Sequence, residues 1–113
     1  MPSVLITGGS GFLGINLIRY LLNKGLYNIT VLDIADFDYP DVRDNVNYVM
    51  GDIRDQALVS NILRGHEIVV HTAAALPLYP PSDIFSTEVD GTRILLQESI
   101  KNRIHRFIHI SST

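Results

Sequence analysis

The sequence contains no cysteine. Disulfides are therefore excluded, and so are thiolate catalysis and metal sites built on cysteine. No apolar run reaches the ~20 residues that a membrane-spanning helix needs. The N-terminus has no basic start followed by an apolar core and a cleavage site, so no signal peptide is predicted. The default expectation is a cytoplasmic protein.

Clusters of basic residues are also missing. Nine Lys and Arg residues stand against twelve Asp and Glu residues, which gives a formal net charge of -3. Surfaces that bind nucleic acid or acidic membranes carry clustered Lys and Arg. The composition therefore predicts neither of these partners. The 113 residues are enough for one modest domain.

The most informative stretch is a glycine cluster that follows the first apolar run. Gly8, Gly11 and Gly14 have the spacing G-x-x-G-x-x-G after Val4–Ile6. The first glycine would permit a tight turn, the second would let backbone amides approach a pyrophosphate, and the third would let the next helix pack closely. The amides and positive dipole end of that helix would face phosphate charge. Such spacing is weak evidence alone, but a preceding strand, a following helix and a later carboxylate strengthen it.

Strands and helices are expected to alternate along the chain. Consecutive apolar residues are typical of buried parallel strands, and apolar residues three or four apart are typical of helices. Strands are predicted at 3–7, 28–33, 46–50, 67–71 and 106–110. Helices are predicted at 12–24, from an N-cap at Asp55 to Gly65, and from 82 or 83 to 102 or 103.

Two segments between these elements are predicted to be loops. Residues 34–45 carry four aspartates and a proline without a clear period, so we expect a solvated loop rather than a metal site. Residues 76–81 hold three prolines and form the second loop. The last helix is expected to have one apolar stripe, at steps of three and four residues. Its members are Phe85, Val89, Thr92, Leu96 and Ile100.

Five strands alternating with helices predict an α/β fold of the Rossmann type. The sheet would be parallel and doubly wound, with strand order 3-2-1-4-5 and helices on both faces. Ligands of such sheets bind at the carboxyl ends of the strands, beside the switch point between strands 1 and 4. The notable residues lie just past predicted strand ends: the 8–14 turn, Asp33, Asp52, Ala73, Ala74 and Ser112.

Four stretches spread over essentially the whole chain carry a family resemblance. They are TGGSGFLG at 7–14, GDIRD at 51–55, HTAA at 71–74 and FIHISS at 107–112. Together they resemble the extended short-chain dehydrogenase/reductase family of the NAD-dependent epimerase/dehydratase type. The resemblance implies that residues 1–113 form an NAD(P)-binding Rossmann domain and that the substrate domain is absent from this chain.

The resemblance also implies which residues contact the cofactor. Ser10, Gly11, Phe12 and Leu13 would contact the pyrophosphate. Asp33, 19 positions after Gly14, would bond the adenosine ribose hydroxyls. A carboxylate there accepts hydrogen bonds from those hydroxyls and repels a 2′-phosphate, so NAD is expected rather than NADP.

Further roles follow from the other matching stretches. Asp52 would accept a hydrogen bond from the adenine amino group, although it could instead cap the next helix, and the backbone of Ile53 would lie beside the ring. Ala73 and Ala74 would line the cofactor channel. Ser112 matches the family's catalytic Ser/Thr, which hydrogen-bonds the reacting oxygen of the substrate.

The sequence departs from the family pattern in two places. The family's Tyr-x-x-x-Lys pair lies downstream of Ser112 and is not in these residues. Tyr20 and Lys24 have that spacing, but they fall on the first helix, and we interpret the match as coincidence. Glu88 stands where the family usually has Asn before its Val-x-Gly-Thr run.

The main functional hypothesis is the NAD-binding portion of an oxidoreductase or isomerase. The parent would be an epimerase, a dehydratase or a 3-hydroxysteroid-type dehydrogenase that transfers hydride between NAD and an alcohol or keto carbon of a nucleotide sugar or sterol. This chain is expected to bind NAD without turnover. The alternatives are a non-enzymatic NAD(P)-sensing or partner-binding domain and a flavodoxin-like domain.

Two further expectations concern the histidines and the last strand. None of the histidine spacings supports a zinc site, so no metal is predicted, and His71 and His109 are expected to be structural. The fifth strand would be an unpaired apolar edge that promotes homo-oligomers or aggregation.

Overall fold

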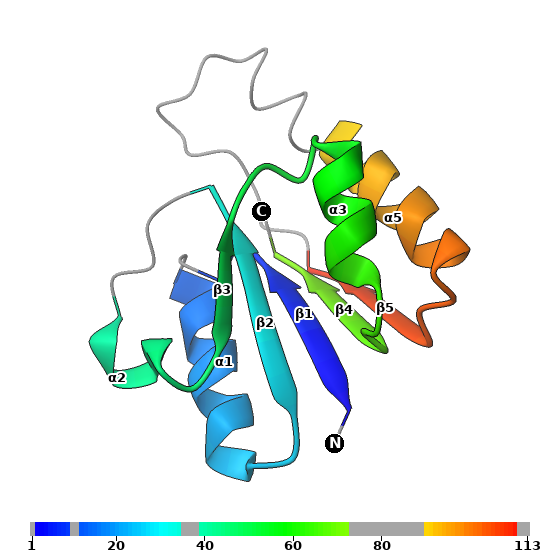
Figure 1. Cartoon of the computed structure of the whole chain (residues 1–113). Helices are drawn as coiled ribbons and strands as arrows, with labels where there is room; N and C mark the ends of the chain where they lie inside the picture. Colours follow the sequence, from blue (N-terminus) through cyan, green and yellow to red (C-terminus); the bar gives the residue numbers. More distant parts are fainter. Residues whose placement is uncertain (1, 10–11, 35–38, 73–89, 111–113) are drawn as a thin grey trace.

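The computed structural model describes residues 2–9, 12–34, 39–72 and 90–110, with backbone alone at Phe12 (Figure 1). The described strands form one parallel sheet in the order β3-β2-β1-β4-β5. The strands are β1 (Ser3–Thr7), β2 (Asn28–Asp33), β3 (Asn47–Met50), β4 (Ile68–His71) and β5 (Arg106–His109). The helices are α1 (Phe12–Lys24), α2 (Pro40–Arg43), α3 (Gln56–Leu63) and α5 (Thr92–Lys101).

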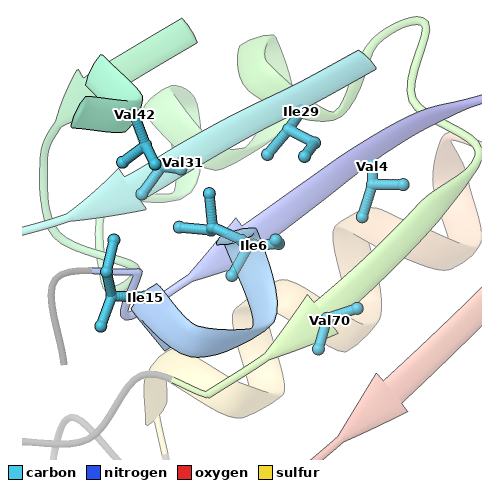
Figure 2. Packing of buried hydrophobic residues seen from close by; sticks show 8 residues of the cluster. Val4, Ile6, Ile15, Ile29, Val31, Val42 and Val70 are labelled. Atoms are coloured by element: carbon cyan, nitrogen blue, oxygen red, sulfur yellow. The ribbon is translucent and has the colours of Figure 1, made fainter. Parts of the chain in front are cut away.

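Helices cover both faces of the sheet, as expected for a doubly wound fold (Figure 1). Alternate strand residues point to opposite faces, so β1 contributes Val4 and Ile6 to one apolar cluster and Leu5 to another. The first cluster contains side chains of α1 and α2, and Figure 2 shows how they meet the strand residues. The second contains side chains of α3 and α5. The sheet is therefore buried between two layers of helices.

The predicted strand order is confirmed, and so are most of the predicted elements. The bounds of β1, α1 and β2 agree with the sequence analysis, and β3, β4 and β5 differ from it by one residue. Asp55 caps α3, because its carboxylate accepts a hydrogen bond of 3.2 Å from the Leu58 amide. Gly25 and Gly65 follow α1 and α3 with φ of 67° and 81°.

The prediction of a loop over 34–45 is wrong in its second half. Pro40 begins α2, a position where its missing amide hydrogen costs nothing. Val42 is only 5% exposed and joins the cluster beneath α1. Arg19 of α1 also holds this turn, since its guanidinium donates to both carboxylate oxygens of Asp41 at 3.1 and 3.3 Å. One buried valine and one ion pair therefore dock the segment on α1.

The predicted apolar stripe of the last helix is wrong at two of its described members, although a third, Thr92, is half-buried. Leu96 is 42% exposed and Ile100 is 77% exposed. Steps of four residues drift by about 40° each around a helix with 3.6 residues per turn, so these residues rotate away from the sheet. The buried face contains Leu95, Glu98 and Ser99 instead. Phe85 and Val89 lie outside the described residues.

No helix in the described parts of the chain has both the length and the apolar character needed to cross a membrane.

The close packing of α1 on β1 predicts a large difference between two glycine substitutions. A Cβ at Gly14 would collide with the Gly8 carbonyl oxygen and lie 2.7 Å from the Gly9 Cα, and both are backbone atoms that cannot rotate away. Gly14→Ala should lower the free energy of unfolding by about 3 kcal/mol or more. Gly25 has no neighbouring atom within 4 Å of such a Cβ, so Gly25→Ala should cost only its backbone strain, about 1 kcal/mol. Urea unfolding monitored by circular dichroism measures both, and equal losses would contradict the packing argument.

Candidate functional site

The carboxyl ends of the five parallel strands lie at one edge of the sheet. The described residues singled out from the sequence lie in the turns that leave this edge or in the strand end and first helical turn beside them. These are Gly8, Leu13, Gly14, Asp33, Asp52 and Ile53. The other predicted site residues, Ser10, Gly11, Ala73, Ala74 and Ser112, lie outside the described residues, as does the Phe12 side chain.

The turn after β1 brings the start of α1 against the end of the strand. Gly8 has φ of 74°, and its amide donates to the Leu32 carbonyl at 2.9 Å. Because Gly14 has no side chain, α1 lies in backbone contact with Gly8 and Gly9. The first amides of a helix have no partner within the helix. Their positive end therefore lies at this edge of the sheet, where an anion would be favoured.

Asp33 ends the neighbouring strand, β2, and its side chain is half-buried. Its carbonyl accepts a hydrogen bond of 2.9 Å from the Gly51 amide. Asp33 also pairs in register with Met50 of β3. The carboxylate is therefore one strand away from the glycine turn, on a backbone held by both neighbouring strands.

Asp52 follows β3 and forms an ion pair with Arg54. Arg54 donates to Oδ2 of Asp52 from Nη2 at 2.6 Å and from Nε at 2.9 Å, and its amide donates to Oδ1 at 2.9 Å. Hydrogen bonding to Arg54 lowers the pKa of Asp52 below its ordinary value, although partial burial opposes this. Asp52 is therefore ionised and fixed in orientation at neutral pH. The alternative role of capping α3 is filled by Asp55.

Ile53, the next residue, has a buried side chain that is 4% exposed. It packs directly on Gly91, where a Cβ would lie 2.5 Å from Ile53 Cδ1. This contact joins the turn after β3 to the residue that precedes α5. The predicted role of the Ile53 backbone beside an adenine ring remains a prediction.

His71 ends β4 and is buried. The sequence analysis predicted a structural role for it but did not identify its partners. Its Nδ1 is hydrogen-bonded to Thr7 Oγ1 at 2.7 Å, and its Nε2 to Thr92 Oγ1 at 2.8 Å. The ring stacks on His109 with centroids 4.9 Å apart. The strand order could have indicated part of this arrangement, since Thr7 and His71 end neighbouring strands in register.

The remaining candidate groups carry no site among the residues that the structure describes. No three His, Cys, Asp or Glu side chains gather there in a way that could hold a metal ion. Tyr20 and Lys24 lie on the exposed surface of α1, with Nζ of the lysine 5.2 Å from the centroid of the tyrosine ring. This is a surface cation–π contact.

Burial of His71 predicts how stability depends on pH. Burial, with a smaller contribution from His109, lowers the pKa of His71 from 6.5 to about 4. Between these two pH values the unfolded chain binds a proton at His71 that the folded chain does not. The contribution of His71 to the free energy of unfolding is therefore fully present above pH 6.5 and is lost as the pH falls towards 4. The complete loss is roughly 3 kcal/mol.

Urea unfolding between pH 7 and pH 4 measures this loss, to which His66 adds in the same direction because burial also lowers its pKa. Imidazole ¹⁵N shifts isolate His71, which should remain neutral until about pH 4. A His71 midpoint near its ordinary pKa would contradict the prediction.

Comparison with known proteins identifies relatives of the whole chain. Residues 5–113 match the model of the 3-beta hydroxysteroid dehydrogenase/isomerase family. A dTDP-glucose 4,6-dehydratase from Streptomyces niveus is 33% identical and aligns with 96% of this chain. The chain covers 37% of that relative.

Two solved structures have the same fold. A Bacillus anthracis dTDP-glucose 4,6-dehydratase in complex with NAD has a TM-score of 0.84 at 26% identity, over 99% of this chain and 38% of that one. A Bifidobacterium longum UDP-glucose 4-epimerase in complex with NAD⁺ and UDP has a TM-score of 0.86 at 26% identity, over 98% of this chain and 37% of that one. This chain therefore spans less than two fifths of the length of each.

The family match, the Rossmann-type sheet and the glycine turn agree with the extended short-chain dehydrogenase/reductase pattern of the sequence. The chain belongs to the 3-beta hydroxysteroid dehydrogenase/isomerase family, within the extended short-chain dehydrogenases/reductases.

Proposed function

We propose that this chain binds NAD along the carboxyl edge of its sheet. The observation that carries the proposal is the combination of the tight glycine turn at the start of α1 with Asp33 one strand away. The diphosphate would lie against the amides that begin α1, and Asp33 would accept hydrogen bonds from the adenosine ribose. NAD is bound in the related dehydratase and epimerase structures, which supports this choice of cofactor.

The described residues fit a dinucleotide. A Cβ at Gly9 would collide with Val31, and a Cβ at Gly14 would collide with the Gly8 backbone, so these glycines let α1 begin close against the strand ends. Leu13 lies in the first turn of α1 with an exposed side chain. Ser10, Gly11 and Phe12 would complete the diphosphate contacts, and Ala73 and Ala74 would line the channel towards the nicotinamide.

Asp52 would accept a hydrogen bond from the adenine amino group. The two donors of Arg54 hold its carboxylate in place, and the low pKa of Asp52 keeps it ionised. A carboxylate has about four acceptor positions, so it can accept from an adenine amino group as well. Arg54 would thus orient the adenine acceptor before the cofactor arrives.

The parent protein would be an oxidoreductase or isomerase of the epimerase, dehydratase or 3-hydroxysteroid dehydrogenase kind. NAD would supply hydride transfer to and from an alcohol or keto carbon of a nucleotide sugar or sterol. Ser112 would hydrogen-bond the reacting oxygen. The related dehydratase, epimerase and 3-beta-hydroxysteroid dehydrogenase support this class of reaction.

Asp33 should determine the choice between NAD and NADP. Calorimetric titration should give an affinity for NAD about tenfold or more above that for NADP, because the carboxylate repels a 2′-phosphate. Asp33→Asn removes the charge at constant shape. It should weaken NAD binding by about tenfold and reduce the ratio of the NAD affinity to the NADP affinity. Asp44→Asn, at the exposed end of α2, is the matched control and should change neither value. Absence of NAD binding, or a preference for NADP, would contradict the proposed function.

Replacing Arg54 should weaken only the contacts to the adenine end of the ligand. Arg54→Gln removes the donors that orient Asp52, so the dissociation constants of NAD and AMP should rise together, by about fivefold. Arg93→Gln is the control, because Arg93 forms an exposed ion pair with Asp90 at 3.7 Å. A loss of NAD affinity without a matching loss for AMP would argue against the adenine role.

A further inference from the structure

Three polar residues occupy the last paired row of the sheet beneath the candidate site. Thr7 pairs in register with His71, and His71 with His109. Adjacent strand residues in register share a face. The neighbouring residues Leu5, Val69 and Phe107 belong to the cluster beneath α3 and α5, two positions earlier on each strand. The polar row therefore lies on the α3 and α5 side, between that apolar core and the carboxyl edge.

His71 of β4 connects this row to α5 and ties β4 to β1 through its two ring nitrogens. Nδ1 reaches Thr7, the last residue of β1, and Nε2 reaches Thr92, the first residue of α5. The Thr7 hydroxyl also accepts a hydrogen bond of 3.2 Å from the Thr72 amide. The His71 side chain is nearly inaccessible, at 1% exposure. A continuous hydrogen-bond chain, buried between Thr7 and His71 and part-buried at Thr92, thus runs from the residue before the glycine turn to the start of α5.

A neutral imidazole suits this position because it has one donor and one acceptor nitrogen. Each threonine hydroxyl can rotate to donate or to accept, so both bonds form with either tautomer. An apolar side chain would leave two threonine hydroxyls without these bonds, which is costly in a buried site. Burial lowers the pKa of His71 and keeps the ring neutral at physiological pH.

The start of α5 is held from a second side as well. Gly91, the residue before Thr92, packs on Ile53 in the turn after β3. A shift of α5 would therefore disturb both the Ile53 contact and the hydrogen bond to His71. The first turn of α5 is located by contacts on both sides of the switch point between β1 and β4.

We propose that His71 is a positioning residue that sets the distance between the glycine turn and the first turn of α5 across the switch point. The inference rests on the proposed function and deepens it: this distance governs binding of the diphosphate and nicotinamide half of NAD. The adenosine half, placed over β2 and β3, depends on His71 much less, because it meets α5 only through the contact of Ile53 with Gly91. His71 acts through Thr7 and Thr92.

His66 provides an internal control with similar chemistry at the opposite edge of the sheet. Its Nε2 is hydrogen-bonded to Thr30 Oγ1 at 3.0 Å, and its Nδ1 to the Ile62 carbonyl at 2.7 Å. His66 comes just before β4, at the amino edge of the sheet, whereas His71 is the last residue of that strand, at the carboxyl edge. Thr30→Val and Thr92→Val each remove one hydroxyl that binds a buried or part-buried imidazole, but only the second lies at the proposed cofactor edge.

The test compares NAD and AMP binding in these two variants of the chain. Thr92→Val should raise the dissociation constant for NAD by about tenfold and that for AMP much less. Thr30→Val should change neither constant, although urea unfolding should show that both variants lose stability. Thr92→Ser keeps the hydroxyl and should restore NAD affinity. Equal NAD affinity in Thr92→Val and the parent sequence would overturn the inference, and so would a parallel loss for AMP.

Amide NMR tests the same link without a ligand. Thr92→Val should move the Gly8 and Gly9 amide resonances, which lie in the turn after β1, whereas Thr92→Ser, which keeps the hydroxyl, should move them less. Unmoved Gly8 and Gly9 resonances would overturn the inference. If the parent sequence binds no NAD, the proposed function fails by that result, and these resonances still decide whether His71 couples α5 to the glycine turn.

Discussion

The whole arrangement depends on the backbone contact between the start of α1 and the end of β1. Gly14 allows that contact, because any Cβ there would meet the Gly8 carbonyl. The contact places the unpaired amides of a helix at the carboxyl edge of a parallel sheet, beside the switch point between β1 and β4. Main-chain geometry alone would therefore favour an anion at this position, and side chains would determine which anion suits it.

Charged side chains lie farther along the same edge, over β2 and β3. Asp33 ends β2, and the Asp52–Arg54 pair follows β3, so the two carboxylates lie on neighbouring strands. Under the proposed function, these two carboxylates beside a helix start would suit a ligand with phosphate at one end and hydroxyl and amino donors at the other. The related dehydratase and epimerase structures contain such a ligand, NAD. Neither the glycine turn nor the carboxylates alone would favour a dinucleotide as strongly as their order along the edge.

Polar side chains within the sheet connect the elements on both sides of the switch point. His71 joins Thr7 and Thr92 by hydrogen bonds at the border of the apolar cluster beneath α3 and α5. Gly91 packs on Ile53 and holds the start of α5 from the other side. Such a network favours one arrangement of β1, β4 and α5, because every other arrangement leaves buried polar atoms unsatisfied. The same orientation of α5 buries Leu95 in the apolar cluster, places Thr92 against His71 and leaves Leu96 and Ile100 exposed.

The sequence pattern alone predicted the strand order, the bounds of β1, α1 and β2, and the Asp55 cap. It also predicted that the glycine turn, Asp33 and Asp52 lie at the same edge of the sheet. These depend on periodicity, glycine positions and parallel connection rules, which act over short stretches of chain. Only the tertiary structure decided that Val42 docks α2, that Arg54 holds Asp52 and that α5 turns Leu95 inward. The tertiary structure also brings His71 into hydrogen-bond contact with Thr7 and Thr92, which lie 64 and 21 positions away in the sequence. Such contacts depend on how helices rotate and how strands align, and that is set by the packing of residues distant in sequence.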